Sequence, residues 1–224
     1  MRFCAASDQA VLVYLGEGIG LSAHERVLKL LRLLQKESPS WLRNLQPAYA
    51  SLMVTFDACL TDSAQVETTL GKLEAQSEKA RSSKPRTIEI PVCYGSEFGP
   101  DLEEVAKIHG LTQPEVIAQH SSQTYLAYFL GFAPGFAYLG DLPESIVTPR
   151  LETPRKTVPA GSVGIAGRQT GVYPFATPGG WRLIGRTPAK MFRSDRKPMT
   201  AISMGDRVKF RPISRKEFLK LEPA

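Results

Sequence analysis

Three side chains in this 224-residue sequence have the types and positions of a site that binds an anion and exchanges protons: His120, Arg150 and Arg155. The two arginines flank Thr153-Pro154 in the segment PRLETPR, and proline restricts the backbone between them. Arginines held in this way suit bidentate binding of a carboxylate or phosphate. Solvated loop arginines are the alternative interpretation.

His120 closes a predicted helix and is followed by Ser121 and Ser122. An imidazole in that position can face a ligand and exchange protons near neutral pH. The alternative is a structural role, because a helix C-terminus favours a positive charge. His109, which precedes Gly110 at another helix end, and His24, in the first turn of a helix, are predicted to be structural or on the surface.

The stretch from Tyr125 to Thr187 alternates short apolar runs with Gly and Pro. This pattern predicts tight turns between short strands. The turns at 131–136 and 159–161 can present backbone amides to a ligand, or can be turns alone. The sequence GxxxxGRT at 180–187 is similar to a phosphate-binding loop, but Pro188 stands where that loop needs a helix. We therefore exclude a phosphate-binding loop there.

The elements that must position these residues divide at a polar stretch, residues 80–85 (ARSSKP). Before it, alternating apolar residues predict strands at 11–15 and 50–56. Helical spacing predicts one helix behind a Ser22–Glu25 capping box and another capped by Asp62 or Ser63. This order of strands and helices predicts a small ferredoxin-like α/β domain over residues 1–84.

Residues 85–224 predict a second domain of a different kind. A strand at 88–92 precedes two short helices at 100–109 and 112–120, the second with a Thr112–Glu115 capping box. Nearly all later signals are β, ending in the alternating residues 207–211. Many short strands with dense turns predict a closed or nearly closed β-barrel. The expected fold class is therefore α+β.

The composition narrows the classes of function. Hydrophobic residues make up 42% and charged residues 22%, and no apolar run is long enough to span a membrane, so we expect a cytoplasmic protein. Cys4, Cys59 and Cys93 lack metal or disulfide spacing, so we expect buried reduced thiols and no metal site. Residues 141–224 carry a net charge of +9, spread between turns. This favours an anionic small molecule or a partner protein rather than nucleic acid.

A long ordered set of motifs resembles a known family, which contains the B subunit of the bacterial ATP-dependent 5-oxoprolinase. The Kip-type inhibitor of sporulation histidine kinases and the first subunit of the group called allophanate hydrolase belong to it too. The resemblance covers essentially the whole chain. It is carried, besides PR…PR, by YGSEFGPDL at 94–102, GFAPGFAYLG at 131–140, VPAGSVGIAG at 158–167, YPFATPGGWRLIGRTP at 173–188 and GDRVKF at 205–210.

The resemblance implies a small α/β domain followed by a cyclophilin-like β-barrel. It further implies a complex with a second barrel protein, the C subunit, and with the A subunit, which together open 5-oxo-L-proline to L-glutamate at the expense of ATP. The chain is then expected to be inactive alone, with ATP a co-substrate of the complex that this chain does not clearly bind. The family is related to the carboxyltransferase region of urea carboxylase, but the sequence has no Met-Lys-Met biotin-attachment motif. The alternative function is inhibition of a histidine kinase by docking.

From the positions that match the family's motifs, we expect a pocket on a barrel face, shared with a partner. His120 would transfer protons, while Arg150 and Arg155 would bind the anion. Gly135 and Gly161 would let the backbone approach the ligand. The implied substrate-binding positions are Glu97, Phe132, Pro134, Gly135, Tyr138, Pro159, Gly161, Gly180, Trp181 and Arg186.

Overall fold

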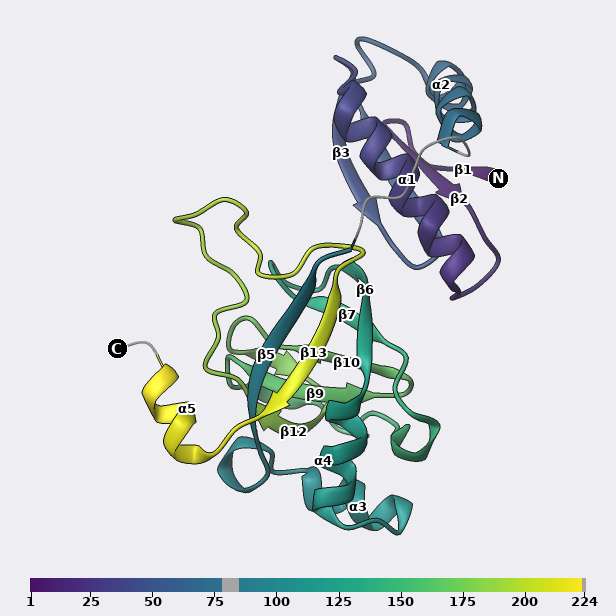
Figure 1. The fold of residues 1–224 in the computed structure, drawn as a ribbon. Helices are drawn as coiled ribbons and strands as arrows, with labels where there is room; N and C mark the ends of the chain where they lie inside the picture. Colours follow the sequence, from purple (N-terminus) through teal and green to yellow (C-terminus); the bar gives the residue numbers. More distant parts are fainter. Residues whose placement is uncertain (78–84, 223–224) are drawn as a thin grey trace. The chain divides into compact units, whose positions relative to one another are not determined.

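The computed structural model describes residues 1–77 and 85–222, drawn as a ribbon in Figure 1. The chain groups into two compact units, Met1–Lys84 and Pro85–Ala224. Of the polar stretch predicted as a boundary, residues 80–84 lie outside the described residues. Among the residues that are described, no helix is long and apolar enough to cross a membrane.

The N-terminal unit is a four-stranded antiparallel sheet in the order β1-β2-β4-β3 with two helices (Figure 1). Helix α1 packs against the sheet with an apolar stripe that includes Val27, Leu30 and Leu34, all fully buried. The elements are β1 (Arg2–Ser7), β2 (Ala10–Tyr14), α1 (Leu21–Glu37), β3 (Leu42–Pro47), β4 (Ser51–Phe56) and α2 (Ser63–Ser77).

This strand order is that of a ferredoxin-like sheet. If β2, β3 and β4 are its first three strands, β1 lies beside β2 where the fourth strand belongs. The sequence prediction missed β1 and β3, which are edge strands whose side chains are exposed or only partly buried. The predicted Ser22–Glu25 capping box is wrong, since α1 begins after Gly20 without a side-chain cap. Asp62 does cap α2, because its carboxylate accepts a hydrogen bond from the Gln65 amide at 2.8 Å.

The C-terminal unit is a closed barrel with the strand order β10-β7-β6-β13-β5-β12-β9, which confirms the predicted fold class. Its first and last strands, β5 and β13, pair in parallel, and the other pairs are antiparallel. The barrel strands are β5 (Thr87–Tyr94), β6 (Thr124–Leu130), β7 (Ala137–Gly140), β9 (Ser162–Ala166), β10 (Gln169–Val172), β12 (Arg182–Arg186) and β13 (Arg207–Pro212).

Short elements surround the barrel. The predicted Thr112–Glu115 capping box is present at the start of α4, and Gly110 ends α3 in the left-handed conformation with φ +63. A separate two-stranded ribbon pairs β8 with β11. These elements are η1 (Ser96–Phe98), α3 (Leu102–His109), α4 (Gln113–Ser122), η2 (Glu144–Ile146), β8 (Arg155–Val158), β11 (Thr177–Gly179) and α5 (Arg215–Leu221).

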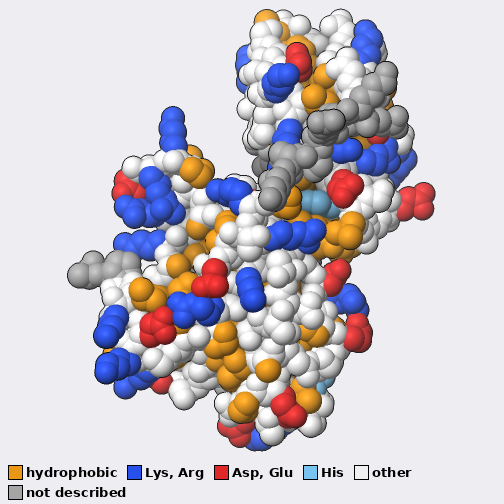
Figure 2. Space-filling model, in the orientation of Figure 1, with side chains coloured by type: hydrophobic (Ala, Val, Ile, Leu, Met, Phe, Trp, Pro, Cys, Tyr) orange, Lys and Arg blue, Asp and Glu red, His pale blue; other side chains and the backbone are white. Residues whose placement is uncertain are grey.

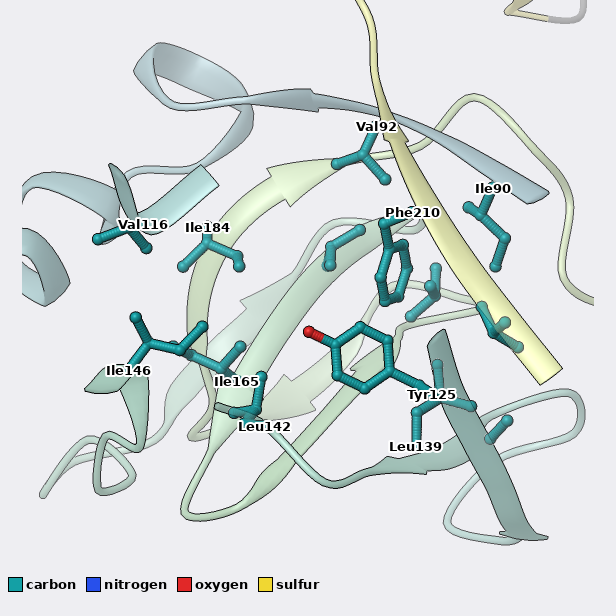
Figure 3. Close-up of a cluster of buried hydrophobic side chains, with 14 of the residues drawn as sticks. Ile90, Val92, Val116, Tyr125, Leu139, Leu142, Ile146, Ile165, Ile184 and Phe210 are labelled. Atoms are coloured by element: carbon teal, nitrogen blue, oxygen red, sulfur yellow. The ribbon is translucent and has the colours of Figure 1, made fainter. Parts of the chain in front are cut away.

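The barrel interior is filled by its own side chains. Figure 3 shows Tyr125 and Phe210 at its centre, with residues such as Leu139, Ile165 and Ile184 pointing toward them, and each of the five is at most 1% exposed. A small barrel of this kind is a packed core rather than a container. A ligand must therefore meet this barrel from outside.

Candidate functional site

Cysteine placement differs from the sequence expectation. All three thiols are free, but only Cys93 is buried, whereas Cys4 and Cys59 are exposed. Cys4 lies on the edge strand β1, and Cys59 lies in the turn after β4. Among the described residues, no three His, Cys, Asp or Glu side chains gather to hold a metal ion.

A second aromatic cluster lies on the outer side of the barrel. Side chains of a strand alternate between faces, so β7 sends Ala137 and Leu139 into the core and Tyr138 outward. In the same way β12 turns Ile184 inward and Leu183 outward. We call the outward rings the aromatic face, and it consists of Phe132, Phe136, Tyr138, Tyr173 and Trp181.

Phe136 is at the centre of the aromatic face. Its ring meets those of Tyr138, Tyr173 and Trp181 edge-on, with centroids 5.0, 5.4 and 5.4 Å away. These arrangements pair the positive edge of one ring with the negative face of the next. Phe132 completes the set 5.4 Å from Phe136 and is 60% exposed. The face is therefore rigid at its base and open at Phe132.

Glycine at position 171 lets the rings of Phe136 and Trp181 approach the backbone of β10 closely. A Cβ added to Gly171 would lie 3.1 Å from Cζ of Phe136 and 3.3 Å from Cζ3 of Trp181. Beside Phe132, an apolar hollow of about 410 Å³ is lined by Leu130, Gly131, Phe132, Ala133, Pro134, Gly135 and Thr200. The predicted turn GFAPGF thus forms one edge of a surface that can take a small flat ligand.

Gly161 holds the turn before β9, and we expect Gly161→Ala to destabilise the barrel by about 3 kcal/mol or more. Its φ is +80, and an added Cβ would lie 2.4 Å from the Thr187 carbonyl oxygen. Gly167→Ala is the matched control, because its φ is +53 but nothing lies within 4 Å of an added Cβ. The control should cost only about 1–2 kcal/mol.

The measurement is urea unfolding in a Trp41→Phe background, in which Trp181 remains as the fluorophore of the barrel. Equal shifts of the urea midpoint for the two glycine variants would show that the close approach of Gly161 to the Thr187 carbonyl does not affect the stability of the barrel.

Arg150 is exposed and lies at the aromatic face. Burial raises the pKa of the Tyr138 and Tyr173 phenols, and the positive charge of Arg150 opposes that rise at both. None of the ion pairs among the described residues includes Arg150. The guanidinium is therefore near enough to both phenols for its charge to act on them, and that charge is available to an anion.

Arg155 is engaged within the protein. Its Nη2 donates to Oδ1 of buried Asp101 at 2.5 Å, and Oδ2 of Asp101 accepts from the Leu183 amide at 2.6 Å. Asp101 therefore neutralises much of the charge on Arg155, which makes Arg155 the weaker anion binder of the two arginines. Sequence reasoning missed Asp101, although it lies within the YGSEFGPDL motif.

His120 lies inside the barrel and not on the aromatic face. It is 0% exposed and stacks on Phe210 at 4.6 Å. The Thr170 hydroxyl donates to the Gly164 carbonyl and so accepts from Nε2 at 2.9 Å, while Nδ1 accepts from the Tyr94 hydroxyl at 2.8 Å. Burial lowers the pKa of His120 to about 3. This placement favours a neutral structural histidine rather than the predicted proton-transfer group.

The remaining predicted residues lie in three different settings. Gly180 and Trp181 adjoin Arg150, because the Gly180 carbonyl accepts from the Leu151 amide at 2.8 Å. Glu97 and Arg186 have other partners. Glu97 pairs with Arg215 at 3.0 Å, and Arg186 donates to the Ala160 carbonyl at 2.9 Å. Pro134 and Pro159 are exposed in turns, and Gly135, with φ +85, packs against the Met191 carbonyl.

Much of the positive charge lies away from the aromatic rings. Figure 2 shows Lys and Arg side chains gathered on the projecting segment between β12 and β13. That segment contains Lys190, Arg193, Arg196 and Lys197, of which Arg193 pairs with Asp195 at 2.6 Å. Part of the positive charge of residues 141–224 therefore lies on a projecting loop and not at the aromatic face.

The fold and the candidate site together define a two-unit protein whose β-barrel carries a cluster of aromatic side chains and a nearby arginine on its outer side. The chain belongs to the family described as the carboxyltransferase domain, subdomain C and D, whose model matches residues 1–202. It is 43% identical to the 5-oxoprolinase B subunit of Bacillus subtilis (strain 168), over 94% of this chain and 92% of that protein. Nothing in these comparisons favours the alternative prediction of a histidine-kinase inhibitor.

Two solved structures resemble the chain. The crystal structure of TTHA0988 is 33% identical with a TM-score of 0.83, and the match covers 93% of this chain but 40% of that chain. The conserved uncharacterized protein PH0987 from Pyrococcus horikoshii is 49% identical with a TM-score of 0.58, over 97% of this chain and 100% of that chain. In TTHA0988 the equivalent of this chain is thus part of a longer polypeptide.

Proposed function

We propose that this chain is the B subunit of a heteromeric ATP-dependent 5-oxoprolinase, which opens 5-oxo-L-proline to L-glutamate. The observation that carries the proposal is the 43% identity to the 5-oxoprolinase B subunit of B. subtilis over 94% of this chain. Because the match extends over nearly the whole of both proteins, it spans both units of this chain.

The chemistry of the substrate fits the aromatic face. 5-Oxoproline is a small, nearly flat lactam ring that carries one carboxylate. Arg150 binds the carboxylate through charge-assisted hydrogen bonds, and Phe132 and Tyr138 contact the ring. Tyr138 and Tyr173, whose pKa values are raised by burial, stay protonated near neutral pH and donate hydrogen bonds.

The same phenols support the expectation that the chain is inactive alone. A protonated phenol does not take up a proton at neutral pH, and the imidazole of His120 is enclosed in the barrel core. The group that activates water, and the residues that hold ATP, then come from the two partners, the A and C subunits. ATP enters the reaction as a co-substrate of the complex, since phosphorylating the lactam oxygen makes the stabilised amide open to attack by water.

The test is an ATP-dependent 5-oxoproline hydrolysis assay on the three proteins of the complex. We expect no glutamate from this chain alone, none from the partners alone, and ATP-dependent glutamate when all are combined. Glutamate formed at the full rate without this chain would overturn the proposal. Omission of ATP serves as the second control.

A further inference from the structure

A buried arginine lies directly beneath Arg150. Arg182, on β12, is 9% exposed, and its Nε donates to the Pro149 carbonyl at 3.1 Å. Its Nη1 lies 2.6 Å from Oε2 of Glu104 on α3. The Arg182 side chain is 11% exposed and that of Glu104 is 55% exposed, so Glu104 supplies the counter-charge of a nearly buried cation and keeps it in place.

The peptide group that follows Arg150 is also fixed by a hydrogen bond. The Leu151 amide donates to the Gly180 carbonyl at 2.8 Å. The carbonyl before Arg150 and the amide after it are therefore both hydrogen-bonded to the segment that leads into and forms β12. This leaves Arg150 little freedom to rotate about its own backbone, although its side chain is exposed.

One helix anchors both ends of the arginine-bearing segment 149–155. Asp101 and Glu104 are three residues apart at the start of α3, the spacing that places side chains on one helix face. Asp101 holds Arg155 at 2.5 Å, and Glu104 holds Arg182, which in turn holds Pro149. The two carboxylates thus fix the segment at its beginning and at its end.

We propose that Arg182, held by Glu104, is a positioning residue that fixes the backbone at Arg150 and so aims its guanidinium over the aromatic face. The inference rests on the proposed function for the role of Arg150 in binding substrate. Arg182 itself touches no substrate, because it lies under the segment that carries Arg150.

Arg182→Lys is the main variant, because one ammonium group cannot span Pro149 and Glu104 as the guanidinium does. We expect hydrogen exchange of the Leu151 amide, which donates to the Gly180 carbonyl, to quicken at least tenfold. We expect kcat/KM of the complex for 5-oxoproline to fall roughly tenfold or more, mainly through KM. Glu104→Gln is the second variant and should shift both readouts in the same direction. Glu103→Gln is the matched control, since Glu103 is exposed and, among the described residues, pairs with Lys107 alone, on its own helix.

The decisive comparison is made in an Arg150→Ala background. There Arg182→Lys should cause no further loss of kcat/KM, because no guanidinium remains to be aimed. Unchanged exchange of the Leu151 amide, or an equal kinetic loss with and without Arg150, would overturn the inference. If the wild-type complex makes no glutamate from 5-oxoproline, the proposed function fails, and the exchange of the chain alone still decides whether Arg182 holds the segment.

Discussion

Replacing Arg150 by Ala is expected to lower kcat/KM of the assembled complex for 5-oxoproline roughly 30- to 100-fold. A hydrogen-bonded charge pair of this kind is worth about 2–3 kcal/mol, and each 1.4 kcal/mol corresponds to a factor of ten. The fold should be unaffected, because Arg150 is exposed and forms no ion pair among the described residues. Arg150→Lys should recover part of the loss, since it restores the charge without the planar fork.

Lys156→Ala is the matched control for this variant, because Lys156 is an exposed cation on β8, directly after the segment 149–155. It should leave the kinetics within about twofold of wild type. Arg155→Ala is expected to lower both activity and stability, because it leaves buried Asp101 without its cation. Wild-type kcat/KM in a correctly assembled Arg150→Ala complex would exclude Arg150 from substrate binding.

The barrel could be predicted from sequence because its signals are local. Each turn between Tyr125 and Thr187 has its own Gly or Pro, and β13 alternates apolar and charged residues. Edge strands lack such signals. Every side chain of β1 and β3 is exposed or only partly buried, so their sequences, RFCAAS and LRNLQP, show no regular apolar period. They are defined only by pairing with β2 and β4.

The site was predictable in its residue types but not in its connections. Trp181, Tyr138 and Arg150 stand out in the sequence, and the structure places them around one face. Their anchors are distant along the chain: Asp101 and Arg155 are separated by 54 residues, and Arg182 and Pro149 by 33. The face to which a side chain points also depends on strand register, which composition does not determine.

His120 illustrates the same point. The chain after α4 enters the barrel, and the two partners of the imidazole lie 26 and 50 residues away on β5 and β10. A histidine at a helix end is exposed or buried according to what covers that end, and nothing near His120 in sequence reveals the covering residues. Its burial nevertheless has a measurable consequence.

Stability of the barrel is expected to fall as the pH is lowered from about 6.5 to about 3. The pKa of His120 is 6.5 in the unfolded chain and about 3 in the folded one, because burial disfavours the charged imidazole. Between these values the unfolded state binds the extra proton, so acid favours unfolding. Stabilisation by the neutral imidazole is complete above pH 6.5 and is lost progressively toward pH 3. The total loss is roughly 5 kcal/mol, of which about 2 kcal/mol falls between pH 7 and pH 5.

The measurement is urea unfolding at pH 7, 6 and 5. It compares the Trp41→Phe protein, as the parent, with the same protein carrying His120→Gln. The Gln variant should be less stable at pH 7, because Gln replaces a ring that fills the space beside Phe210. Its stability should nevertheless change with pH by about 2 kcal/mol less than that of the parent, since Gln does not titrate. Carboxylates and the other histidines contribute equally to both proteins and cancel in this difference. If the free energy of unfolding changed with pH equally in both proteins, His120 would have the same pKa in the folded and the unfolded chain. His120 would then again be a candidate proton-transfer group.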